Sequence, residues 1–177
     1  DGAVTLYHDN GVRFTTTATG IDVTGTVNGI PFFSDVTNNS MYTHDVSGTD
    51  STAQYNTAYG FTAMDAISSG DNNTAIGFQA GSAINGGHQN TLVGSLAGDA
   101  ITTGEKNVAL GYSALTTSVD GDYNTAIGYR ALEDYEDGDS NGHNTAVGSQ
   151  SQLNATTGEF NTSLGSLSMG SGVLTGD

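Results

Sequence analysis

The sequence predicts an all-β fold, a parallel β-solenoid of short, similar coils. A five-residue motif, Asn followed by Thr or Val, a small or aliphatic residue, an apolar residue and Gly, occurs seven times. The motif recurs at every seventeenth position in five of the six intervals, and the sixth interval, from Asn124 to Asn144, is 20. Gly is frequent, at 26 of 177 residues, but follows no every-third-residue pattern, and no apolar period typical of helices survives it. A short fixed period is typical of units that stack on their neighbours.

Residues 1–30 are predicted to form a separate β segment. Two runs that favour strands, residues 3–7 and 12–17, flank Asn10-Gly11, a pair suited to the tight turn of a β-hairpin. Residues 20–27 alternate apolar and polar side chains, which predicts another short strand. The pattern weakens over residues 31–55, where Pro31 excludes a central strand position. We expect this stretch to be a connector.

Residues 56–177 are predicted to be the solenoid, with seven coils. With the motif Asn numbered position 0, position 3 is apolar, position 4 is Gly and position 7 is small in every copy. We expect two strands of about four residues per coil, joined by two turns, with positions 3 and 7 holding coils and chains together. The Asn side chains are expected to bond from coil to coil or to cap the turn, and the Gly to allow a positive φ or the close approach of another chain. The predicted structural residues are Asn56, Gly60, Asn73, Gly77, Asn90, Gly94, Asn107, Gly111, Asn124, Gly128, Asn144, Gly148, Asn161 and Gly165.

One coil offers too few large apolar side chains for the core of a monomer. Other apolar residues would give each coil a second apolar surface: Phe61, Phe78, Tyr112, Tyr129, Met64, Leu115 and Leu132. The simplest way to bury this surface is against identical chains around a shared axis, which favours a homotrimer.

Charge and composition exclude several classes of function. The net charge of -16 repels phosphate backbones and anionic lipid, so we expect neither nucleic-acid binding nor binding to membrane surfaces. No stretch of about 18 consecutive apolar residues occurs, so we expect no membrane insertion. The chain has no Cys, which excludes disulfides and thiolate metal sites. Because it opens on Asp1 and closes on Gly176-Asp177, a pair that elsewhere leads into a repeat, we expect a fragment or processed product with further coils.

The 20-residue interval contains a candidate calcium site. Asp137, Asp139 and Asn141 alternate as oxygen ligands do in the first half of a calcium loop, although Gly148 stands where a bidentate acid is expected. The alternative is a solvated acidic loop. The four His residues show no metal-ligand spacing, and no nucleophile motif or carboxylate pair is singled out. We expect no catalysis and no cofactor other than this calcium.

The motif resembles repeats of known families. Asn73 to Ala80 and Asn124 to Ala131 resemble the head repeats of trimeric autotransporter adhesins, in which each repeat is one turn of a left-handed parallel β-roll. The longer turns containing Thr-Gly-Asp are more similar to repeats of bacteriophage tail fibres, and residues 2–17 with 20–25 resemble a segment of structural fibre proteins of marine and cyanobacterial phages. The resemblance implies a left-handed, homotrimeric roll in a virion fibre on tail or capsid. Its expected partners are further copies, other fibre or baseplate proteins, and a host-surface glycan or protein.

Three alternatives remain open. The chain could be an adhesin head at a bacterial surface, which needs a stalk and a membrane anchor elsewhere. It could be an ice-binding solenoid, because Thr occupies position 1 in six of the seven copies and would form a ladder. It could also be a shaft without receptor contacts. Thermal hysteresis and cell-binding measurements separate these classes.

Overall fold

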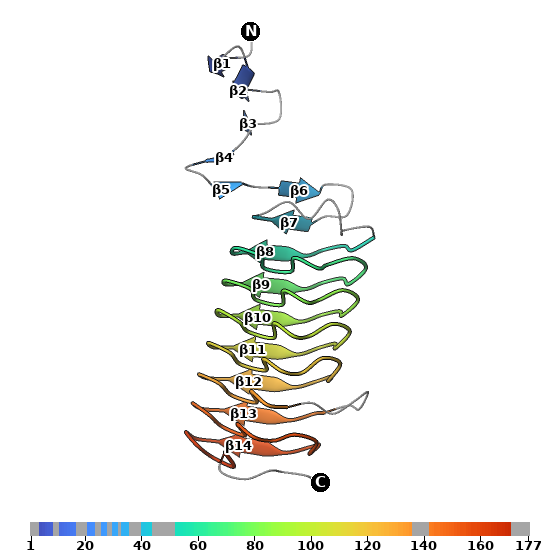
Figure 1. The fold of residues 1–177 in the computed structure, drawn as a ribbon. Helices are drawn as coiled ribbons and strands as arrows, with labels where there is room; N and C mark the ends of the chain where they lie inside the picture. Colours follow the sequence, from blue (N-terminus) through green and yellow to red (C-terminus); the bar gives the residue numbers. More distant parts are fainter. Residues whose placement is uncertain are drawn as a thin grey trace.

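The structure is a computed structural model that describes residues 4–8, 11–16, 21–23, 26–27, 30–31, 33–35, 40–43, 52–135 and 142–170. These residues contain β-strands and turns but no helix, and they form an elongated body with β1 and β14 toward opposite ends (Figure 1). The all-β prediction is therefore confirmed for the described part of the chain.

Antiparallel strands make up the N-terminal segment. Strands β1 (Thr5–His8), β2 (Gly11–Thr16) and β3 (Ile21–Val23) form a three-stranded antiparallel sheet, with His8 opposite Gly11. Strand β4 (Thr26–Val27) pairs with β5 (Ile30–Pro31), so Pro31 lies in a two-stranded pair, away from any central position. The predicted hairpin strands are present, while the turn residue Asn10 lies outside the described residues.

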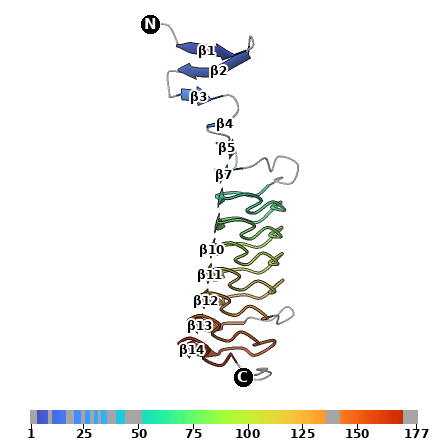
Figure 2. The same cartoon turned by 60° about the vertical axis from the view of Figure 1, so that its left-hand side comes forward.

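The rest of the chain is a β-solenoid of about six turns, in which equivalent residues recur at every seventeenth position in most coils. Its nine-stranded sheet has the order β14 to β6. The strands are β6 (Phe33–Asp35), β7 (Ser40–Tyr42), β8 (Thr57–Tyr59), β9 (Thr74–Ile76), β10 (Thr91–Val93), β11 (Val108–Leu110), β12 (Thr125–Ile127), β13 (Thr145–Val147) and β14 (Thr162–Leu164). Strands β7 to β14 are all parallel, and equivalent repeat positions pair from β8 onward. The strands line one side of the solenoid and the turns extend to the other (Figure 2).

Within residues 52–135 and 142–170, each coil contains one three-residue strand, not the two strands expected. Positions -1, 6 and 8 adopt the left-handed conformation, and the non-Gly residues among them have φ between 49° and 60°. Extended strands need strongly negative φ, so these residues turn the chain at corners instead of continuing it as a second strand. The parallel sheet also begins with β7, in the stretch expected to be a connector.

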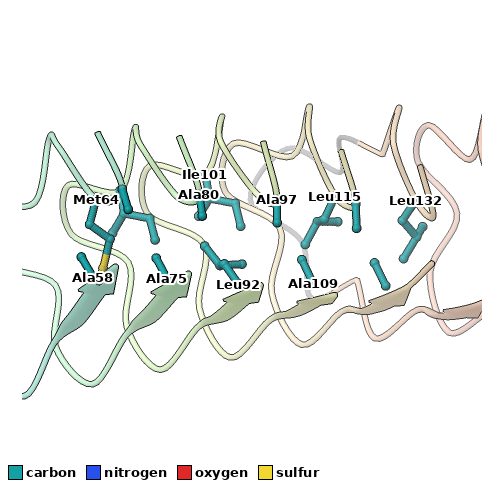
Figure 3. Packing of buried hydrophobic residues seen from close by; sticks show 14 of the residues in the cluster. Ala58, Met64, Ala75, Ala80, Leu92, Ala97, Ile101, Ala109, Leu115 and Leu132 are labelled. Carbon is teal, nitrogen blue, oxygen red and sulfur yellow. The ribbon is translucent and has the colours of Figure 1, made fainter. Parts of the chain in front are cut away.

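The core is lined by position 2, not by position 3 as predicted. Side chains alternate along a strand, so the inward Asn at position 0 places position 2 inward and position 3 outward. The position-2 residues of the first six repeats are completely buried: Ala58, Ala75, Leu92, Ala109, Ala126 and Ala146. Figure 3 shows the strand residues pointing toward the small position-7 residues on the facing turns. The predicted burial of position 7 is confirmed for Ala63, Ala80, Ala97, Ala114, Ala131 and Ser151.

Positions 8 and 11 complete the core. Met64, Leu115 and Leu132, predicted to belong to a second apolar surface, are fully buried at position 8. Ile67, Ile84 and Ile101 are buried at position 11. Leu92 is the large residue of the position-2 column, and a Cβ on Gly81 or Gly98 would lie within 3 Å of its methyl groups. Glycine at position 8 therefore leaves the space that Leu92 fills.

Candidate functional site

Buried asparagines connect successive coils. The Asn at position 0 is at most 1% exposed in the first six repeats. Each Oδ1 accepts a hydrogen bond from the backbone N–H of the next Asn, at 2.8 to 3.1 Å from Asn56 to Asn161. The Nδ2 of Asn56, Asn73, Asn90, Asn107 and Asn144 donates to the carbonyl of the Gly fourteen residues later, at 2.7 or 2.8 Å. The structure thus shows both a ladder and a local turn contact.

Two hydroxyl residues take over these contacts at the N-terminal end of the stack. The N–H of Asn56 donates to Ser40 Oγ at 3.0 Å, where later coils use an Asn oxygen. Thr43 Oγ1 exchanges hydrogen bonds with the backbone of Gly60, at 2.9 and 3.2 Å. Tyr42, 1% exposed, closes the core between them. The motif did not identify β7 in the sequence, because Ser40 stands at the position of the Asn and Thr43 at the position of the apolar residue.

Two glycine columns allow the coils to approach closely. The position-4 Gly residues have φ between 123° and 145°, which L side chains rarely adopt. A Cβ on Gly94 would lie 2.7 Å from the carbonyl carbon of Gly111. A Cβ on Gly87, in the second column, would lie 2.5 Å from the carbonyl oxygen of Gly104. The close neighbour predicted for these glycines is the next coil of the same chain, not another chain.

The outward side of the sheet is an apolar surface, which we call the strand face and define as positions 1 and 3. Position 3 is exposed or half-buried in every repeat: Tyr59, Ile76, Val93, Leu110, Ile127, Val147 and Leu164. Position 1 forms a column of Thr in which Val108 stands for Thr. A Thr ladder thus faces outward once per coil, with an aliphatic or aromatic column beside it instead of a second Thr.

Acidic residues are absent from the strand face. None of the 19 Asp and Glu residues occupies position -1, 1, 3 or 5 of a repeat. Several acids instead lie two residues before the motif Asn, where their carboxylates accept hydrogen bonds from the backbone of the preceding coil. The N–H of Gln54 donates to Asp71 Oδ1 at 2.8 Å, and the N–H of Glu105 donates to Asp122 Oδ1 at 2.6 Å. The Nδ1 of His88, at the same repeat position, accepts a hydrogen bond from the N–H of Asp71 at 2.9 Å. The negative charge therefore borders the turns and leaves the strand face neutral.

Aromatic rings stack along two columns that flank the strand. At position 5, Phe61 stacks on Phe78 with ring centroids 6.3 Å apart, and Tyr112 on Tyr129 at 5.6 Å. At position -1, His143 lies between Tyr123 and Phe160, at 4.6 and 5.0 Å. Lys106 lies over the ring of Tyr123 and bonds to its hydroxyl at 2.9 Å, a contact that raises the pKa of this lysine above its usual range. All four aromatic residues of the position-5 column are exposed, so the prediction that they belong to an apolar surface of the coil is confirmed: Phe61, Phe78, Tyr112 and Tyr129.

The predicted calcium ligands are not placed by the structure. Asp137, Asp139 and Asn141 lie outside the described residues, as does His44. Among the residues that are described, no group of three His, Asp or Glu side chains could hold a metal ion. The calcium site stays a prediction.

Asp99 is a half-buried carboxylate beside the core. Burial is the main cause that raises its pKa above the ordinary 3.8, and backbone hydrogen bonds at Asp99 and Ala100 oppose the change. Its buried Oδ1 has no hydrogen-bond partner within the described part of the chain. The ionised form is therefore less well solvated in the fold than in the unfolded chain.

Substituting Asp99→Asn should raise the melting temperature at pH 7. Because the folded-state pKa is raised, the stability that this group contributes is fully present below pH 3.8 and is lost as the pH rises through the folded value. The uncharged amide avoids that loss, so the gain should shrink as the pH falls toward 3. Thermal unfolding of both proteins at several pH values measures this. An equal difference at pH 3 and pH 7 would contradict the electrostatic cause.

Comparisons with protein-family models, curated proteins and solved structures gave no match. In the described residues, no helix is long and apolar enough to cross a membrane.

Proposed function

We propose that the chain is a structural segment of a homotrimeric virion fibre, on a tail or capsid, that takes part in host attachment without catalysis. The observation that carries this proposal is the neutral, apolar strand face on a chain of net charge -16. Ile76, Leu110 and Leu164 are 41%, 46% and 79% exposed there. A contiguous exposed apolar surface of this kind is typical of protein–protein contacts.

Charge favours contact between copies through this face. Two chains of charge -16 repel each other, and the repulsion is smallest where no carboxylate lies between them. The strand face meets that condition along its length, while the turns carrying Asp71, Glu105 and Asp122 would point away from a shared axis. Three such faces around an axis would bury the apolar columns and leave the acidic turns in solvent.

A fibre also suits the mechanics of the stack. Every coil bonds to the next through the strand, the Asn ladder and the turn backbone, so load along the axis is shared by many hydrogen bonds. The peripheral turns, including the acidic 20-residue interval, are the proposed surfaces for a host glycan or protein, and the ends for other fibre or baseplate proteins. The same architecture would serve an adhesin head at a cell surface.

Leu110→Glu tests the proposed assembly. Leu110 is exposed in the single chain, so we expect the variant to fold, with a change in stability of about 0.5 kcal/mol or less. In a trimer it would bring one carboxylate from each chain into an apolar contact. We expect native mass measurement to give a trimer for the parent chain and a monomer for the variant.

Val119→Glu is the matched control. Val119 is 39% exposed but lies outside the strand face, so this variant should keep the mass of the parent. A monomeric parent would overturn the proposed fibre. A variant Leu110→Glu that remains trimeric would show that the chains meet through another surface.

A further inference from the structure

The aromatic column at position 5 is interrupted at Ser95. Phe61 and Phe78 stack with an interplanar angle of 4°, and Tyr112 and Tyr129 with one of 14°. Ser95 occupies the equivalent position between Phe78 and Tyr112. One ring is thus missing from a run of five positions.

The backbone keeps its register across this gap. The N–H of Leu96 donates to the carbonyl of Phe78 at 2.9 Å, and the N–H of Ser113 donates to that of Ser95 at 3.0 Å. Equivalent bonds join Gln79 to Phe61 and Arg130 to Tyr112, at 3.0 and 2.9 Å. Phe78 and Tyr112 therefore stand in one column, two coils apart, with the small Ser95 side chain at the level between them.

The spacing suits one planar ring. Two coils of about 4.8 Å each separate the levels of Phe78 and Tyr112 by roughly 9.6 Å. A ring inserted midway would lie about 4.8 Å from each neighbour, inside the range of about 4.5 to 7 Å that aromatic pairs prefer. Phe78 and Tyr112 are 49% and 48% exposed, so both rings lie at the surface of the solenoid.

The geometry points to an aromatic-binding slot walled by Phe78 and Tyr112 with Ser95 at its base, whose occupant is an aromatic side chain of a partner protein. The rings of this chain already stack in the same column, with centroids 6.3 and 5.6 Å apart and so within the same preferred range, which favours a further ring. The charge of -16 disfavours phosphate-bearing rings such as nucleotides and favours an occupant that is neutral or carried by a basic partner. The slot is complete in one chain, so the inference does not depend on the proposed trimer.

N-acetyl-tyrosinamide is the probe, followed by the amide NMR signals of Ser95 and Leu96 in the whole chain. We expect saturable shifts for this probe and none for N-acetyl-cyclohexylalaninamide, which has a similar size but no aromatic ring. Ser95→Tyr fills the slot with the chain's own ring and should weaken probe binding by about tenfold or more. Ser149→Tyr adds a ring below Tyr129 without filling the slot, and should bind as the parent does.

Circular dichroism and native mass of both variants show that fold and assembly are retained, which separates this test from that of the fibre. Unsaturable shifts with the tyrosine probe would overturn the inference. So would equal binding of the cyclohexyl probe, equal binding by Ser95→Tyr, or a methyl glucoside that shifts the same signals in place of the aromatic probe.

Discussion

Replacing Gly94 with alanine should remove about 3 kcal/mol or more from the free energy of unfolding. Gly94 has a φ of 137°, a conformation that strains any L residue. The added Cβ would also lie 2.7 Å from the carbonyl carbon of Gly111 and closer still to its oxygen. These atoms belong to the paired backbone of the next coil, so neither can move without breaking hydrogen bonds. Urea unfolding followed by circular dichroism measures the loss.

Two glycine controls separate strain from collision. Gly165 has a similar φ, 123°, but a Cβ there meets nothing described within 4 Å, so Gly165→Ala should show the cost of strain alone. Gly86→Ala has no positive φ, and its nearest neighbour is Ser69 Oγ at 3.5 Å, so it should be close to neutral. If Gly94→Ala is no more harmful than Gly165→Ala, the close approach of the coils is not what requires glycine.

Asn90→Ala should destabilise the chain by about 2 to 5 kcal/mol, because it leaves two groups without partners. The Oδ1 of Asn90 accepts from the N–H of Asn107 at 3.0 Å, and its Nδ2 donates to the carbonyl of Gly104 at 2.8 Å. Asn90 is fully buried, and water cannot replace these contacts without opening the stack. Urea unfolding, with hydrogen exchange at the Asn107 amide as a local measure, tests this.

Asn85→Ala provides the comparison. Asn85 lies five residues before Asn90 but is exposed, and its side chain makes a long contact of 3.4 Å to the carbonyl of Ala66. We expect a change of about 0.5 kcal/mol or less. Equal effects of Asn90→Ala and Asn85→Ala would mean that the ladder adds little to stability.

The sequence was sufficient to predict the solenoid and its period, because stacked coils place equivalent residues in equivalent surroundings. The motif Asn and Gly stood out since each position has a strict requirement: the Asn must both donate and accept, and the Gly must lack a Cβ. The bonding of Asn73 to Asn90, and the close approach of Gly94 to Gly111, give those requirements a physical cause.

The direction of the side chains was harder to predict. Position 3 carries the larger apolar residues, such as Ile76 and Leu110, and was assigned to the core, whereas the core takes the smaller Ala75 and Ala109. The Asn at position 0 was expected to bond from coil to coil, but the inward direction of its side chain was not used to place position 2 inside and position 3 outside. The left-handed corners are occupied by varied residue types, such as Gln79 and Leu115. The sequence therefore did not indicate that the chain turns there instead of forming a second strand.

Because of the hydrogen-bond ladder, duplication or deletion of repeats within the gene would change the number of coils in the solenoid without disturbing the contacts between them. A coil contacts its neighbours through bonds between equivalent positions of successive repeats, so a unit gained or lost in the middle would leave each remaining coil with a matching partner. The step from Asn124 to Asn144 is longer than the others, yet the N–H of Asn144 still donates to Asn124 Oδ1 at 3.1 Å. Unequal recombination between repeats could therefore lengthen or shorten the rod, or enlarge one turn, without disturbing the core.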